Sequence, residues 1–369
     1  MGRKGKARPT EARDPSGLQA VGTLRLGALL AVMLAVAAAA LTPGSAYAQS
    51  VEQFYAGKQL KLFVGGGAGG GYDFYGRIIA PYMSKHLPGN PTILIQGMPG
   101  AGGIVAANHL YNRSPRDGSE LGIVGRVVST HPLLNPKDTV VKYDPRQFNW
   151  IGTPLQEVGL LIVRGASPVN TLKDLKVHQL MVAGTAPSAP PSFYPAVMNK
   201  VLGTKFQIIS GYASLQEALF AVERGETDGY VASSASAALR DRIAPWIKEG
   251  KVKLVAQIGL SKDPRNGDVP LILELAETAI ERQLMELILT QQVMAWPFVA
   301  PPGVPDDRVK ALRDAFDATM KDAAFLEDAA KTRTEIDPVS GLKLHELLDQ
   351  IHAMPKETLD RLQSLSAKP

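Results

Sequence analysis

Short apolar runs alternate along the chain with segments in which apolar residues recur every three or four positions. The runs at 60–64, 92–96 and 121–125 have the length and composition of buried strands. After the first run, apolar residues on one face of a helix follow, namely Tyr75, Ile78, Ile79, Tyr82 and Met83. Strands that alternate with helices in this way predict βαβ units and an α/β fold.

The same alternation continues through the second half of the chain. Strands are expected at 159–165, 180–185, 206–210, 227–233 and 253–259. Between them, a helix is expected over 193–202, and Ser214 with Glu217 forms a capping box that begins a second helix, which ends near Gly225. Two lobes are expected, each a mainly parallel sheet flanked by helices, because the chain is too long for one hydrophobic core.

The first 48 residues have a different pattern, typical of a cleavable signal peptide. Six basic and two acidic residues lie within the first 25, and the unbroken apolar stretch Leu26–Leu41 follows. Ala46 and Ala48 then provide a small-residue cleavage site. The alternative, an uncleaved membrane anchor, is disfavoured because a bilayer span needs ~20 apolar residues. We therefore expect export and a periplasmic location.

With residues 1–48 taken as the signal peptide, the remaining chain divides into the two lobes. We expect lobe 1 to comprise 49–153 plus 258–369, and lobe 2 to comprise 154–257, with the ligand cleft between them. Extended crossing segments are placed near 149–154 and 254–259.

Charge and cysteine content exclude several classes of function. The chain has a net charge of +5, but most of the excess lies in the leader, so no basic stripe for nucleic acid remains. The chain has no cysteine, which rules out disulfides, thiolate metal sites and a cysteine nucleophile.

Three loops rich in glycine or proline follow predicted strands, at Gly65–Asp73, Pro99–Gly103 and Gly184–Ser192. In open α/β sheets, ligands bind beyond the carboxyl ends of the strands, where helix N-termini attract anions. Six of the seven residues from Gly65 to Gly71 are glycine, more than a tight turn requires, so an open backbone surface is favoured. The loops predict a site for a small carboxylate in the cleft.

The predicted ligand-binding residues come from these loops and from one further turn. They are Gly66, Gly67, Gly70, Tyr72, Asp73, Pro99, Gly100, Ala101, Gly102, Gly103, Thr185, Ser188, Ser192, Phe193 and Asp228. Each also has a structural interpretation: Asp73 is a candidate N-cap, the hydroxyl residues are candidate turn or cap residues, and the aromatic residues are candidate packing residues. Asp228 is equally suited to a solvated turn.

Nucleotide and enzyme functions find less support. Gly65, Gly67 and Gly70 match G-x-G-x-x-G, but a run of glycines matches it almost automatically, and Gln96 stands where an acidic ribose ligand belongs. The histidines have no metal-ligand spacing, and no G-x-S-x-G is present. No cofactor, no metal and no catalytic residue are expected. A hydrolase or a lyase built from distant residues stays open, as does a nucleotide-dependent α/β enzyme.

The chain resembles the extracytoplasmic receptors of tripartite tricarboxylate transporters, the Bug family. The resemblance rests on segments in the family's order, at 60–81, 92–111, 114–124, 143–152, 167–175, 211–232 and 298–312. It implies a two-lobed periplasmic-binding-protein (Venus flytrap) fold whose first two loops hold a small organic carboxylate through backbone groups and ordered water. It also implies delivery to a permease of one large and one small membrane subunit, and we expect a monomer. A periplasmic sensor with no transport role is the alternative.

The chain departs from the family in two loops. Gly65 and Gly66 begin the first loop, and Tyr72 precedes Asp73, where the family often has a small Thr or Ser. In the third loop, Pro191-Ser192-Phe193 replaces a Ser-x-His type of ending. A bulkier or aromatic ligand end is therefore expected there, rather than citrate-like specificity.

Overall fold

A computed structural model describes residues 1–2, 49–185, 189–212 and 214–366 of the chain. The chain divides into two units, Met1–Ser50 and Val51–Pro369, and the fold described here is that of the second. The predicted signal peptide lies almost entirely outside the described residues. Helices and two separate sheets build the second unit, as the alternation of apolar patterns predicted.

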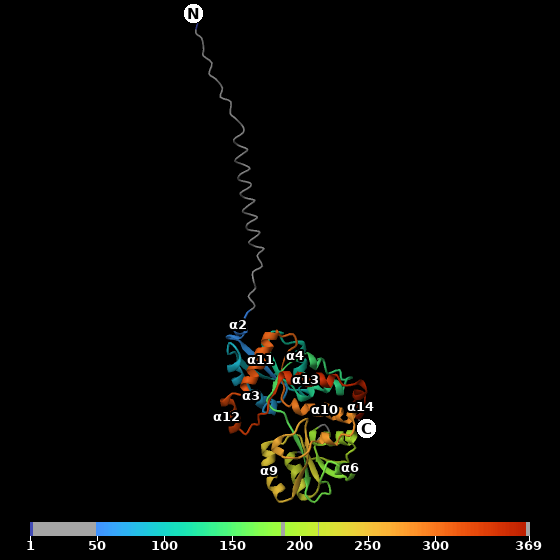
Figure 1. Ribbon diagram of the computed structural model, residues 1–369. Helices are drawn as coiled ribbons and strands as arrows, with labels where there is room; N and C mark the ends of the chain where they lie inside the picture. The colour runs from blue at the N-terminus through green and yellow to red at the C-terminus, as the bar shows by residue number, and fades with distance from the viewer. Residues whose placement is uncertain (3–48, 186–188, 213, 367–369) are drawn as a thin grey trace. The chain divides into compact units, whose positions relative to one another are not determined.

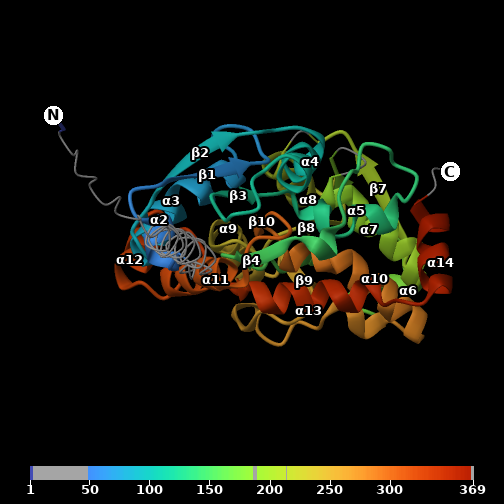
Figure 2. The ribbon, with the colours of Figure 1, turned by 90° about the horizontal axis from the view of Figure 1, so that it is seen from above.

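The first sheet has the strand order β11-β4-β10-β3-β1-β2. Its strands are β1 (Gln59–Val64), β2 (Thr92–Gly97), β3 (Glu120–Ile123), β4 (Asn149–Thr153), β10 (Phe298–Ala300) and β11 (Val339–Ser340). β1 pairs in parallel with both β2 and β3, and these three strands lie side by side (Figure 2). β10 runs antiparallel to β3 and β4, and β11 runs antiparallel to β4.

The second sheet has the order β7-β6-β8-β5-β9. Its strands are β5 (Gly159–Arg164), β6 (Leu180–Gly184), β7 (Phe206–Ser210), β8 (Gly229–Ala232) and β9 (Val252–Ile258). β6 pairs in parallel with β7 and β8, whereas β5 pairs antiparallel with β8 and β9.

Both sheets are therefore mixed, which corrects the expectation of mainly parallel sheets. The strands joined by crossover helices are parallel, because a crossover brings the chain back to the same end of the sheet. β5 and β10 instead follow connections from the other sheet, over 154–158 and 259–297. They enter at the edge where the parallel strands end, and so they run in the opposite direction.

Helices cover the sheets and connect the strands. The longer ones are α3 (Gly71–His86), α4 (Ile104–Asn112), α7 (Pro190–Leu202), α8 (Leu215–Arg224), α9 (Ala237–Lys248), α10 (Ala279–Val293), α11 (Asp306–Thr319), α12 (Ala323–Lys331), α13 (Gly341–His352) and α14 (Lys356–Ser366). The shorter ones include α2 (Val51–Tyr55), α5 (His131–Leu134) and α6 (Asp174–Val177). Late helices pack on early elements: α11 contacts α3, and α11 and α13 contact β4 (Figure 1).

The helix face predicted after β1 is largely buried. Tyr75, Ile79 and Met83 of α3 lie in a hydrophobic cluster with β1 and β3 residues and with Phe316 of α11. Ile78 and Tyr82 are partly buried at its margin. This packing fixes the first turn of α3, and with it the glycine loop, against the first sheet.

Strand direction decides which loops can meet. The carboxyl ends of β1, β2 and β3 lie at one edge of the first sheet, and those of β6, β7 and β8 lie at one edge of the second. The chain passes from sheet to sheet through 154–158 and again through 259–297, a segment that includes α10. Leu271 in the second connection bridges to Gln257 of β9. The lobe boundaries expected from the sequence stay a prediction.

Candidate functional site

The loops after β1, β2 and β3 touch through their backbones. A Cβ atom on Gly65 would lie 3.0 Å from the Cα of Gly103, and a Cβ atom on Gly103 would overlap the backbone nitrogen of Gly125. A Cβ atom on Gly125 would in turn overlap the carbonyl oxygen of Gly102. Glycine is required at these positions by close packing of the three loops, so part of the predicted glycine signal is structural.

The second loop also holds backbone in the left-handed region. Gly103 has φ 93°, and Ala101 has φ 45° although it carries a Cβ atom. A non-glycine residue in this region costs about 1–2 kcal/mol, and such strain gathers at ligand-binding loops. Pro99, Gly100 and Ala101 are exposed, so this strained turn faces outward from the contact between the loops.

Two glycines of the first loop have different surroundings. A Cβ atom on Gly67 would meet no described atom within 4 Å, whereas one on Gly66 would lie 2.9 Å from Cδ2 of Tyr72. Gly70 donates its backbone N–H to the carbonyl of Gly67 at 3.0 Å, which closes a turn. Gly67 is therefore the position at which a methyl group tests ligand access without disturbing the loop.

Asp73 does not cap α3, which corrects one of its predicted roles. The helix begins at Gly71 with Gly70 as N-cap, so Asp73 lies inside the first turn. Its Oδ2 accepts the backbone N–H of Gly69 at 2.9 Å and the Nε–H of Arg77 at 3.0 Å. These hydrogen bonds, with Arg77 the larger cause, lower the pKa of the Asp73 carboxyl. The carboxylate thus links Gly69 of the glycine loop to Arg77 of α3 and stabilises the conformation of the loop.

Tyr72 connects the first loop to the loop after β3. Its hydroxyl oxygen accepts the backbone N–H of Arg126 at 3.1 Å, and its ring meets the Trp296 ring edge-on with centroids 4.7 Å apart. The Trp296 ring occupies the space that a side chain at residue 71 would need. The tryptophan precedes β10, so a segment distant in sequence forms part of this end of the site.

Arg126 lies at the centre of this arrangement, and the sequence analysis missed it. Its Nη1 donates to Oε2 of Glu157 at 2.8 Å and to Oε1 of Gln292 at 3.3 Å. The side chains of Arg126 and Glu157 are only 20% and 9% exposed. Burial alone would lower the pKa of Arg126, but the Glu157 carboxylate, together with Tyr72 and Tyr194, outweighs this effect and raises it. The ion pair is fully formed and largely shielded from water.

A signal for Arg126 was present in the sequence. It follows the predicted strand at 121–125 by one residue, and carboxyl ends of parallel neighbours share an edge. Glu157 and Gln292 had no comparable signal, because they come from the two connections between the sheets.

The third predicted loop lies at the carboxyl edge of the second sheet. Ser192 is buried, and its hydroxyl donates to the carbonyl of Thr185 at 3.2 Å, so it holds the beginning of α7 against β6. Thr185 is half-buried, as is Phe193, whose ring tilts against Tyr194. Ser188 lies outside the described residues. α7 begins at Pro190, three residues before the predicted start, because the prolines at 190 and 191 occupy its first turn.

Groups of the second lobe's elements interact with Arg126 and with its partners Glu157 and Gln292. Burial raises the pKa of the Tyr194 hydroxyl on α7, and the Arg126 charge counteracts this effect. Glu157 donates its backbone N–H to the carbonyl of Gln292 at 2.8 Å, and Gln292 donates from Nε2 to the carbonyl of Ser233 at 2.7 Å. The carboxyl edges of the two sheets are thus joined beside the glycine loops.

Asp228 is not part of this group. It precedes β8, and its backbone N–H donates to the carbonyl of Met181 at the beginning of β6. Its carboxylate accepts a hydrogen bond from Nη2 of Arg164 at 3.1 Å. Because β6 and β8 are parallel, Asp228 lies at the edge opposite Thr185. Asp228 therefore cannot cover a ligand held beside Thr185, which corrects its predicted role.

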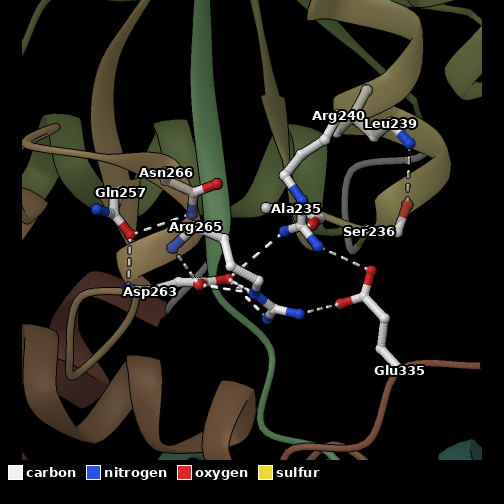
Figure 3. A network of polar contacts seen from close by, with 9 residues as sticks. All are labelled: Ala235, Ser236, Leu239, Arg240, Gln257, Asp263, Arg265, Asn266 and Glu335. Atoms are coloured by element: carbon white, nitrogen blue, oxygen red, sulfur yellow. Dashed lines mark hydrogen bonds and ion pairs between the residues drawn. The ribbon is translucent and has the colours of Figure 1, made fainter.

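A second link between the sheets is ionic (Figure 3). The Glu335 carboxylate, just before β11, accepts from Arg240 of α9 at 3.0 Å and from Arg265 at 3.2 Å. Asp263 pairs with Arg265 at 2.7 Å and with Arg240 at 3.5 Å. We call these four residues the Glu335 cluster. Tyr75 of α3 donates its hydroxyl hydrogen to the Glu335 carbonyl at 3.2 Å, so the cluster also contacts the helix that follows the glycine loop.

Several further features lie outside this region. A surface groove of about 700 Å³ runs along α4 and is lined by residues such as Val105, Asn108 and Val140, none of them a predicted site residue. Within the described ranges, no three His, Asp or Glu side chains are placed to hold a metal ion. No helix in the same part of the chain has both the length and the apolar character of a membrane span.

Several known proteins are similar to this chain over most of its length. A protein of Cupriavidus necator, "UPF0065 protein in gbd 5'region", is 26% identical over 305 residues, which is 81% of this chain and 85% of that protein. A TctC solute-binding protein from Polaromonas, solved with no ligand, matches with a TM-score of 0.64 and 19% identity, over 84% of this chain and 99% of that one. The R. palustris protein Rpa4515, solved with adipate, matches with a TM-score of 0.52 and 18% identity, over 83% and 97%.

The structural matches confirm the predicted α/β fold of a periplasmic binding protein. The model of the family described as "Tripartite tricarboxylate transporter family receptor" matches residues 76–350, which is most of the chain. The matched residues include most of α3, the predicted loops at 99–103 and 184–192, and Arg126. The chain belongs to the tripartite tricarboxylate transporter receptor family.

Proposed function

We propose that this protein is a periplasmic receptor that captures a small organic carboxylate and delivers it to the large and small membrane subunits of a tripartite tricarboxylate transporter. Family membership supports the transport role. The adipate with which the R. palustris protein Rpa4515 was solved supports the ligand class. Export through cleavage of residues 1–48 belongs to the same proposal.

The observation that carries the carboxylate proposal is the convergence of three strand-to-helix loops at one edge of the first sheet. α3 and α4 begin directly at the first two loops. The first backbone N–H groups of a helix have no partner within the helix and carry a partial positive charge. Exposed glycines let a carboxylate approach these groups closely. The proposed cradle comprises Gly66, Gly67, Gly70 and 99–103.

The second sheet would cover the other end of the ligand. Thr185, Ser192 and Phe193 are at its carboxyl edge, and the Tyr194 hydroxyl is near enough to Arg126 for the arginine charge to act on its pKa. With lobes at 49–153 plus 258–369 and at 154–257, closure about the two connections would shift an open–closed equilibrium, and the permease would recognise the closed form. The receptor acts as a monomer without cofactor or catalytic step.

Thermal melting against a panel of organic acids, aromatic carboxylates, NAD and ATP tests this proposal. A ligand at 100 times its dissociation constant stabilises the folded protein by roughly 2.7 kcal/mol, which raises the melting temperature measurably. A carboxylate among the stabilising compounds is the expected result. Stabilisation by a nucleotide alone would overturn it. Reconstituted uptake with the membrane subunits separates a transport receptor from a sensor.

A further inference from the structure

Arg126 is held in one orientation by contacts on one side only. Its backbone N–H is bound to Tyr72, and its Nη1 is bound to both Glu157 and Gln292. The guanidinium carbon lies 5.6 Å from the centre of the Trp296 ring. A guanidinium with these partners is positioned before any ligand arrives, so little conformational entropy is lost on binding.

The other side of the guanidinium offers hydrogen-bond donors. Arginine carries five N–H groups, of which two are on Nη1. For Nε and Nη2, the described residues provide no hydrogen-bond acceptor. Trp296 adds a further donor, since its Nε1 is buried with no partner among the described residues. The surroundings of Arg126 therefore favour a ligand atom that accepts hydrogen bonds.

Glu157 determines whether a charged or a neutral acceptor binds more favourably beside Arg126. Its carboxylate already neutralises Arg126 and is 9% exposed, so water screens it weakly. A second ligand carboxylate on the free side of the guanidinium would lie roughly 4 Å from the Arg126 charge and roughly 7 Å from Glu157, so repulsion would cancel more than half of the attraction. The remaining attraction must also offset the cost of removing that carboxylate from water.

A neutral acceptor avoids both costs. An amide, ketone or hydroxyl oxygen can accept the Nε–H and Nη2–H bonds, gains the strength of a hydrogen bond to a charged donor and loses little hydration. We infer that Arg126 and Glu157 make this receptor selective for monocarboxylates whose far end carries a neutral hydrogen-bond acceptor, over dicarboxylates of the same length.

This inference rests on the proposed function, because the glycine loops are taken to hold the ligand's one carboxylate. Glu157 is then the residue that determines specificity. Changing Glu157→Gln keeps the side-chain size but removes the opposing charge, so the free Arg126 charge should favour a second carboxylate.

Isothermal titration calorimetry on the purified protein tests the inference with pairs of ligands that differ by one charge. Succinate, adipate and suberate are each compared with their half-amide, which keeps chain length and shape. In the unaltered protein, the half-amide of the best-fitting length should bind about tenfold more tightly than its dicarboxylate. In E157Q the order should reverse. E226Q, which removes an exposed carboxylate paired with Arg224, is the control and should keep the original order.

The outcomes separate the two proposals. Equal or tighter binding of the dicarboxylate by the unaltered protein would overturn the selectivity but leave the carboxylate receptor intact. That comparison needs no variant, so a poorly folded E157Q cannot obscure it. A panel in which no acid binds at all would overturn the proposed function and the inference with it.

Discussion

At the scale of single residues, neighbouring glycines have unlike reasons to be glycine. Gly125 has no room for a side chain, because the Gly102 carbonyl occupies that space. Gly67 has open space on the side where a Cβ atom would stand. The sequence displays both simply as glycine. Only the surroundings separate a packing requirement from access for a ligand.

This difference predicts that one alanine substitution lowers stability and the other weakens ligand binding. Gly125→Ala should lower the free energy of unfolding by about 2–3 kcal/mol, because the backbones of two loops must separate to admit the methyl group. Gly67→Ala should leave that free energy within about 0.5 kcal/mol but weaken carboxylate binding. Urea unfolding and calorimetric titration of both variants measure the two quantities. Wild-type stability of Gly125→Ala, or wild-type affinity of Gly67→Ala, would contradict the assignment.

At the scale of elements, local signals succeeded where the chain itself supplies the partners. The capping box predicted at Ser214 is an N-cap in the structure: its hydroxyl accepts the backbone N–H of Glu217, and α8 ends at Gly225 in the left-handed conformation. At Asp73 the same kind of signal misled. The carboxylate lies inside the helix and binds the loop before it. A capping residue three positions from the true start produces an almost identical sequence pattern.

The Ser214 cap gives a prediction at this scale. Ser214→Ala should lower the free energy of unfolding by about 1 kcal/mol, because a backbone N–H at the start of α8 loses its acceptor. Ser214→Asp should preserve stability, since aspartate caps equally well. Urea unfolding of the three proteins measures the difference. If the alanine and aspartate variants lose stability equally, the hydroxyl contact is not what stabilises the helix start.

At the scale of the whole molecule, the Glu335 cluster links elements that the chain separates widely. Arg240 belongs to a helix that contacts β9 in the second sheet, whereas Glu335 precedes β11 in the first. The Glu335 side chain is 17% exposed and the Arg240 side chain is 21% exposed, so the ion pair between them is partly shielded from water. A link of this kind stabilises the arrangement in which the two sheets' edges lie together.

Removing the charge of Glu335 should therefore weaken ligand binding at a distance. We expect Glu335→Gln to reduce carboxylate affinity about threefold to fivefold, the equivalent of about 1 kcal/mol for two partly exposed ion pairs. Titration calorimetry measures this change. Glu327→Gln, which removes an exposed carboxylate paired with Lys331 on α12, is the control and should bind normally. Unchanged affinity in the Glu335 variant would mean that the cluster does not favour the binding form.

The sequence by itself determined the α/β class, the positions of most strands and the three loops rich in glycine or proline, because hydrophobic periodicity, glycine and capping residues act within a few residues of one another. The family resemblance was likewise available from local segments in order. Two helices of the second half, α9 and α10, were not singled out, although α10 begins with a capping box of Thr278 and Glu281.

Only the tertiary structure decided the direction of β5 and β10, the exclusion of Asp228 and the assembly of Arg126 with Glu157, Gln292 and Trp296. Each depends on strand direction or on contacts across long stretches of chain: Arg126 and Gln292 are 166 positions apart. A polar residue in a connection between the sheets, such as Glu157 or Gln292, has no local sequence pattern that predicts its partner. The chemistry around Arg126 is therefore set by pairs that form only when the two sheets come together.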